Sequence, residues 1–63
     1  MAQKPTAKLV GANGNIFNLM GIASRALKEA GLDAEATKMR EEVMSCGSYD
    51  EALVTIMDYV EVE

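Results

Sequence analysis

The chain has 63 residues, of which 10 are acidic, 6 are basic and none is histidine, so its formal net charge is −4. Hydrophobic residues make up 49% of the chain, and Cys46 is the single cysteine. This composition excludes a disordered acidic tail, an intramolecular disulfide, and most metal-site or catalytic-triad chemistry. The length predicts one small domain with a marginal core.

The first ten residues predict an arm followed by a strand. Pro5 opposes helix formation, so we interpret residues 1–6 as a flexible arm ahead of a single domain over residues 7–63. The short apolar stretch 7–10 lies between this proline and Gly11, which predicts a brief strand.

A turn and a first helix are expected next. The Asn13–Gly14 pair predicts a turn in which both residues have positive φ. Asn15 is placed to cap a helix over residues 16–30, whose apolar residues recur with helical spacing. Gly31 follows where a helix commonly closes with a left-handed residue.

Two further helices are expected after this glycine. Asp33 is the predicted N-cap of the second helix, which we expect to end near Gly47. Ser48 is the predicted N-cap of the third helix, and Glu51 three residues later predicts a capping box.

The last residues change their hydrophobic period. Valine and glutamate alternate there, which predicts a strand at 60–62 that pairs with 7–10 and places Lys8 beside Glu61. The alternative is that the third helix runs on to the end. The predicted fold is α+β: a small, mostly helical domain of order β-α-α-α-β with a short two-stranded sheet formed by the chain ends.

The helical stripes and the strands together define an expected core. Its predicted members are Leu9, Ile16, Leu19, Met20, Ala23, Leu27, Met39, Val43, Leu53, Ile56 and Val60. One methionine falls on each helical stripe and is expected to fill core space: Met20, Met39 and Met57.

Two segments carry a resemblance to a known family. Residues 8–15 read K-L-V-G-A-N-G-N and are followed by Phe17, and the chain closes with Tyr59-Val60-Glu61-Val62-Glu63. This pattern resembles a family of short bacterial proteins from prophages and other mobile elements, with a K-L-V-G-x-[DN]-G-N-x-F opening and a Y-V-[DE]-V close. The resemblance implies a bacterial, cytoplasmic, mobile-element setting and assigns no activity, cofactor or site residue.

A glycine-containing turn between a strand and a helix is one candidate site. Gly11, Asn13, Gly14 and Asn15 could direct backbone N–H groups toward an anion at the start of the first helix. The lysine and serine or threonine of a phosphate-binding loop do not follow, however. The structural alternative is a tight turn that ends in a helix cap.

Catalytic and metal-binding constellations are not evident in the sequence. Cys46 has the spacing of a residue at the edge of the core, and no histidine could act as its base. The adjacent acid pairs Glu41–Glu42 and Asp50–Glu51 point about 100° apart on helices, so neither pair converges on one atom. We therefore expect no enzymatic activity, no cofactor and no metal site.

The favoured function is a non-enzymatic protein-interaction module of a bacterial mobile element. Phe17, Ile22, Met44 and Val54 lie beside the apolar stripes and form the candidate interaction surface. The expected partners are a second copy, as a two-fold dimer, and an unidentified protein, because so small a core commonly needs support. The acidic balance argues against nucleic-acid binding, and no apolar run suits a signal peptide or a membrane span, so we expect a cytoplasmic protein. The alternatives are an anion- or ligand-binding module that uses the Gly11–Asn15 turn, and an acidic mimic of nucleic acid.

Overall fold

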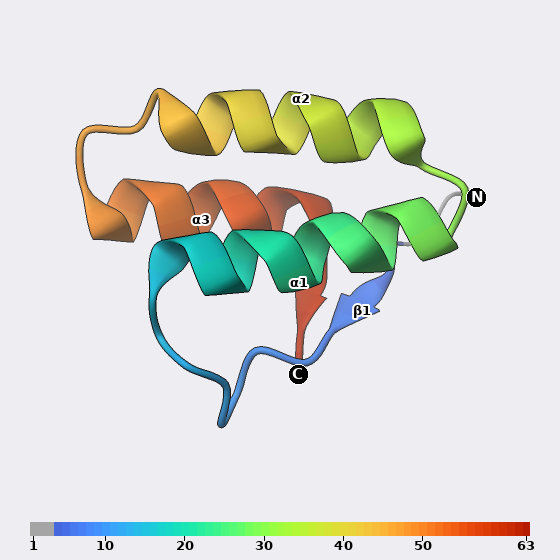
Figure 1. The fold of residues 1–63 in the computed structure, drawn as a ribbon, viewed down its shortest axis with the longest axis horizontal. Helices are drawn as coiled ribbons and strands as arrows, with labels where there is room; N and C mark the ends of the chain where they lie inside the picture. The colour runs from blue at the N-terminus through green and yellow to red at the C-terminus, as the bar shows by residue number, and fades with distance from the viewer. Residues whose placement is uncertain (1–3) are drawn as a thin grey trace.

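A computed structural model describes residues 4–63 (Figure 1). It contains three consecutive helices, with one strand before them and one strand after them, and the two strands form a sheet. Their bounds are β1 Thr6–Ala7, α1 Ile16–Glu29, α2 Asp33–Met44, α3 Tyr49–Tyr59 and β2 Glu61–Val62. Helix α1 packs against both α2 and α3, while β1 contacts α1 and β2 contacts α3. The predicted α+β fold of order β-α-α-α-β, with a sheet made by the chain ends, is confirmed.

The two strands pair in parallel. Thr6 lies opposite Glu61 and Ala7 lies opposite Val62. The predicted neighbours Lys8 and Glu61 are therefore not opposite each other, and that prediction is wrong. The strand prediction for the last residues is confirmed over the alternative of a longer third helix, because Val60 has an extended backbone with φ −136° and ψ 155°.

Part of the predicted N-terminal arm belongs to the sheet. The backbone N–H of Glu61 donates to the carbonyl of Pro5 at 2.9 Å, and Thr6 is the first residue of β1. The strand therefore begins one residue earlier than its predicted start, and the paired segment reaches into the range 1–6. Of the rest of the predicted arm, Lys4 donates from its Nζ to the carbonyl of Met57 at 3.2 Å, and residues 1–3 lie outside the described residues.

The sheet loses its regular pattern soon after it begins. The N–H groups of Leu9 and Val10 both donate to the carbonyl of Glu63 at 2.9 Å, and the N–H of Glu63 donates to Ala7 at 2.9 Å. Two donors on one acceptor interrupt the evenly spaced bonds of a parallel ladder. This is why β1 is shorter than the predicted strand 7–10.

The positive φ angle in the following loop occurs at Gly11. The N–H of Ala12 donates to the carbonyl of Leu9 at 3.1 Å, and Gly11 between them has φ +85°. A positive φ at the third position is the signature of a type II turn. The prediction of positive φ at Asn13 and Gly14 is wrong, since the turn is completed before the chain reaches them.

Helix α1 begins and ends as predicted. The side-chain oxygen of Asn15 accepts a hydrogen bond from the N–H of Phe17 at 2.9 Å. At the other end Gly31 has φ +79°, and the N–H of Leu32 donates to the carbonyl of Leu27 at 2.8 Å. This bond closes a Schellman motif, which satisfies a terminal carbonyl of the helix.

Helix α2 differs from its predicted ends. Leu32 is its N-cap and makes no side-chain capping bond, whereas the predicted cap Asp33 is the first helical residue. The Schellman turn of α1 ends at Leu32, so no residue remains between the two helices to serve as a separate cap. The carboxylate of Asp33 still lies in the first turn, where the helix dipole favours it. The helix ends at Met44 with Ser45 as C-cap, earlier than the predicted Gly47.

Helix α3 has its predicted cap with a shifted partner. The Oγ of Ser48 accepts from the N–H of Glu51 at 3.2 Å. The Oε2 of Glu51 accepts from the N–H of Gly47 at 3.3 Å, one residue before the position of a standard capping box. The reciprocal arrangement nevertheless satisfies two backbone donors at this helix start.

The core lies where the three helices meet the sheet. All predicted core residues are buried except Ile16 and Leu53, which are partly buried and pack against it. Four small residues outside the predicted core list are also buried: Ala7, Ser24, Ala36 and Ala52. Met57 is 49% exposed, so its predicted place in the core is wrong.

Candidate interaction surface

The residues of the predicted anion-binding turn do not leave their donors free. The side-chain oxygen of Asn13 accepts from the N–H of Asn15 at 2.9 Å, and Asn15 in turn accepts from the N–H of Phe17. Gly11 belongs to the preceding type II turn, away from this pair. Two N–H groups that would face an anion are thus already bonded within the chain, as in the structural alternative of a capped turn.

The four predicted interaction residues do not form one patch. Phe17, Met44 and Val54 are 59%, 63% and 58% exposed, whereas Ile22 is partly buried and packs against the core. The prediction that Ile22 is a surface residue is therefore wrong. Phe17 and Met44 line the same hollow, while Val54 lies on α3 and lines none of the hollows next to them.

A groove runs between α1 and α2. We define the α1–α2 groove by six of its lining residues: Phe17, Gly21, Ser24 and Lys28 of α1, and Arg40 and Met44 of α2. Two adjoining hollows compose it, and both include Phe17 and Arg40. The four α1 residues recur at intervals of four, three and four, so they follow one face of the helix. The groove was not predicted from the sequence, because its two walls come from different helices.

The apolar end of the groove lies at the start of α1. The two helices run antiparallel (Figure 1), and Phe17 at the start of α1 lines the same hollow as Met44 at the end of α2. Buried Met20 forms the floor between them. Two large exposed apolar side chains thus line one hollow, which makes this end of the groove a candidate contact site.

Small residues form the middle of the groove. A Cβ added to Gly21 would meet no atom within 4 Å, so the space above this glycine is open. Ser24, one turn further along α1, is 5% exposed and also lines the groove. Another backbone could therefore approach α1 closely at this point.

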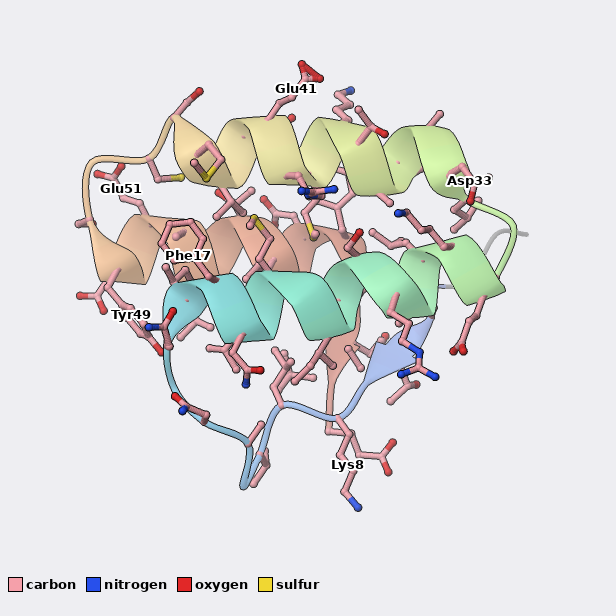
Figure 2. All side chains as sticks on the ribbon, viewed as in Figure 1. Lys8, Phe17, Asp33, Glu41, Tyr49 and Glu51 are labelled. Carbon is pink, nitrogen blue, oxygen red and sulfur yellow. The ribbon has the colours of Figure 1, made fainter. Side chains whose placement is uncertain are left out.

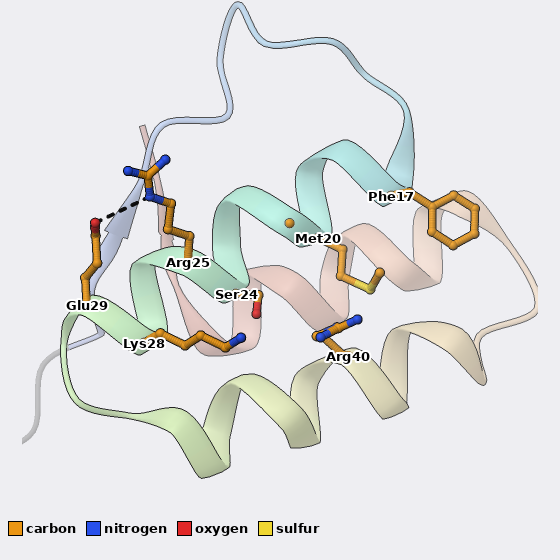
Figure 3. A pocket seen from close by; sticks show the side chains of 8 residues that line it. Phe17, Met20, Ser24, Arg25, Lys28, Glu29 and Arg40 are labelled. Atoms are coloured by element: carbon orange, nitrogen blue, oxygen red, sulfur yellow. Dashed lines mark ion pairs between the residues drawn. The ribbon is translucent and has the colours of Figure 1, made fainter.

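The basic end of the groove carries positive charge that the chain itself does not pair. Within residues 4–63 the one ion pair joins the Nε of Arg25 to the Oε2 of Glu29 at 3.4 Å, across one helical turn. Lys28 and Arg40 lie over the space between α1 and α2, and neither takes part in it (Figure 3). Besides Glu29, which is paired with Arg25, Glu41 is the other acidic residue that lines the groove. The groove is thus locally positive in a protein of net charge −4.

Negative charge collects at the junction of α2 and α3. The hydroxyl of Tyr59 donates to the Oε2 of Glu42 at 2.9 Å. Burial of the phenol, the hydrogen bond to Glu42 and the charges of Glu42, Glu35 and Asp58 together raise the pKa of Tyr59 to about 12, and burial is the largest of these causes. The field that these acids create opposes any further negative charge there.

Cys46, possible metal ligands and possible membrane-spanning helices are the remaining features to place. Cys46 is partly buried at the core edge, as predicted, and its Sγ lies 3.2 Å from the carbonyl of Glu42 and 3.4 Å from the Oγ1 of Thr55. Residues 4–63 contain no group of three or more cysteine or acidic side chains arranged to hold a metal ion. In the same part of the chain, every helix is too short or too polar to cross a membrane.

Comparison of the chain with protein-family models, with curated proteins and with solved structures finds no match.

Proposed function

We propose that this chain is a non-enzymatic protein-interaction module, and that its α1–α2 groove binds an acidic amphipathic helix of another protein. One observation carries the proposal: exposed Phe17 and Met44 continue directly into the unpaired Lys28 and Arg40 on a molecule that is otherwise acidic. A groove of this composition complements a helix with apolar anchors and carboxylates on one face.

The dimensions of the groove suit a short helix. Phe17 and Lys28 are eleven positions apart on α1, or about 16 Å at a rise of 1.5 Å per residue. A bound helix of about three turns would place apolar side chains against Phe17 and Met44 and a carboxylate near Arg40. The open space at Gly21 favours close approach between these two ends.

Lys28 and Arg40 of the groove make no ion pair within residues 4–63, which favours the groove over the anion-binding turn and over nucleic-acid binding. At the Gly11–Asn15 turn, N–H groups that an anion would require are bonded by Asn13 and Asn15. Nucleic acid is disfavoured by the net charge of −4 and by the carboxylates of Glu29 and Glu41 in the groove lining. The bacterial, cytoplasmic, mobile-element setting implied by the family resemblance completes the proposal, with a partner encoded by the host or by the element.

The test is affinity capture from an extract of the bacterium that encodes the chain. The bait proteins are the natural chain, Arg40→Glu and Gly21→Gln in the groove, and Lys8→Glu as a control with the same charge change as Arg40→Glu. Lys8 is exposed and points away from the helices (Figure 2). We expect a partner that the natural chain and Lys8→Glu retain and that both groove variants lose. Retention of the same proteins by all four baits would refute the proposal, as would loss of the partner after nuclease treatment.

A further inference from the structure

We infer that copies of this chain associate head to tail, with the outer face of α3 of one copy bound in the α1–α2 groove of the next. The outer face of α3 is defined by Asp50, Val54, Met57 and Asp58, which are all exposed. The inference rests on the proposed function in one respect, namely that the groove binds acidic amphipathic helices.

The outer face of α3 has the composition that the groove requires. Val54 and Met57 are 58% and 49% exposed, and they lie one helical turn apart. Asp50 precedes Val54 by one turn and Asp58 follows it by one turn, so a carboxylate flanks the apolar pair on either side. Within residues 4–63 neither Asp50 nor Asp58 takes part in an ion pair, so the fold leaves this acidic amphipathic helix face exposed.

The complementarity extends to the helix ends. The last turn of α3 contains no basic residue of its own, and Lys4 reaches it from another segment, where its Nζ donates to the carbonyl of Met57 at 3.2 Å. With the end of α3 beside Lys28 and Arg40, the carboxylate of Asp58 faces positive charge. Helix α3 has 11 residues, or about 16 Å, which matches the separation of Phe17 and Lys28 along α1.

The two complementary surfaces belong to different parts of the molecule. No residue of α3 lines either hollow of the groove, so a copy cannot fill its own groove with its own α3. Joining the groove of one copy to α3 of another is a heterologous contact, which leaves one groove and one α3 face free at the ends. This arrangement differs from the two-fold dimer predicted from the sequence, in which the same patch of both copies meets.

Self-association of this kind regulates the groove. Each copy whose groove holds a neighbouring α3 is closed to another protein, and a partner with a better helix displaces the neighbour. The fraction of open grooves therefore falls as the concentration of the chain rises. Because charge pairs contribute to the contact, added salt opens the grooves again.

Sedimentation equilibrium over a range of concentrations, at low and high salt, tests the inference. The groove variant is Lys28→Glu with Arg40→Glu, and the face variant is Val54→Lys with Asp58→Lys. The matched control is Lys8→Glu with Lys38→Glu, which changes the charge as the groove variant does at exposed sites outside the groove. Circular dichroism establishes that each variant is folded, and Val54→Ser replaces the face variant where it is not.

We expect the natural chain and the control to grow beyond two copies at low salt, and we expect salt to reverse this growth. Either variant alone weakens association by roughly tenfold or more, because charge reversal places like charges together. A mixture of the two variants gives a 1:1 complex that grows no further, since one contributes an intact α3 face and the other an intact groove.

A natural chain that stays monomeric at low salt, or that stops at two copies, would overturn the inference. The proposed function fails separately, when the captured partner is insensitive to Arg40→Glu. A monomeric chain whose partner still depends on Arg40 would refute head-to-tail association alone.

Discussion

The hydroxyl of Tyr49 donates a hydrogen bond of 2.6 Å to the backbone carbonyl of Gly14, 35 positions earlier in the chain. Tyr49 is the first residue of α3, and Gly14 immediately precedes the N-cap of α1. The bond therefore joins the starts of two helices and holds the loop that carries the cap. It also places Phe17, the second residue of α1, at a defined position beside the end of α2.

Replacing Tyr49 with phenylalanine removes this bond and keeps the ring. We expect Tyr49→Phe to lower the free energy of unfolding by about 1 kcal/mol, the usual net contribution of one intramolecular hydrogen bond. Urea unfolding followed by circular dichroism measures the change. An unchanged urea midpoint would mean that water replaces the tyrosine hydroxyl without loss.

The two glycines of the first loop are expected to respond differently to alanine. Gly11 has φ +85°, so Gly11→Ala forces a side chain into the left-handed region and destabilises the fold by about 1 kcal/mol or more. Gly14 has no positive φ, and an added Cβ would lie 3.6 Å from the Tyr49 hydroxyl, an ordinary contact. Gly14→Ala is therefore expected to be close to neutral. Thermal unfolding of both variants decides the matter, and a larger loss for Gly14→Ala would contradict the assigned turn.

Gly21 keeps the space above α1 open, and we expect it to lower the stability of the helix relative to alanine. Its added Cβ meets nothing within 4 Å, and alanine favours a helix interior over glycine by up to about 1 kcal/mol. At high salt and low protein concentration, where the grooves are open, we expect Gly21→Ala to raise the melting temperature by about 4–8 °C per kcal/mol for a domain of this size. A lower melting temperature under these conditions would contradict the open space at Gly21.

The Tyr59 phenol is expected to ionise late. Its folded pKa of about 12 lies above the ordinary 10.0, so the unfolded chain loses this proton first as pH rises. The stabilisation from protonated Tyr59 is complete below about pH 10 and is lost as pH rises toward about 12. In the Tyr49→Phe background Tyr59 is the single tyrosine, so tyrosinate absorbance reports it alone.

The control for this titration is Glu42→Gln in the same background. Glutamine has no charge, so the Tyr59 pKa is expected to fall toward its ordinary value. Equal midpoints with and without Glu42→Gln would exclude this carboxylate as a cause of the shift.

Local signals account for the features that the sequence predicts well. Asn15 and Ser48 cap helices through donors two and three residues away, so their spacing is visible in the chain itself. Gly31 likewise closes α1 by a local rule. The core residues follow from helical periodicity, whereas Met57 shares the period of its stripe but lies where no other element covers it.

Long-range geometry accounts for the features that were missed. The parallel register of Thr6 with Glu61 depends on how three helices bring the chain ends together, which no local pattern reports. The Asn13–Gly14 pair predicts a turn with positive φ, but in the structure the side-chain oxygen of Asn13 instead accepts a hydrogen bond from the N–H of Asn15. To predict the groove, one would have to know that antiparallel packing brings Phe17 and Met44 to the same hollow. One would also have to know that Arg40 forms no ion pair within residues 4–63, and a sequence shows neither.

The pairing of β1 with β2 also has a consequence for how the chain folds during synthesis. The helices can form as each segment leaves the ribosome, because their bonds are local. The segment that includes Ala7 and Leu9 is made before the three helices, but its backbone partners are residues 61–63. The backbone groups of Ala7 and Leu9 therefore cannot form their hydrogen bonds to Glu63 until nearly the whole domain has left the ribosome. The sheet therefore cannot form before residues 61–63 have been made, and a nascent chain halted before Glu61 would lack it.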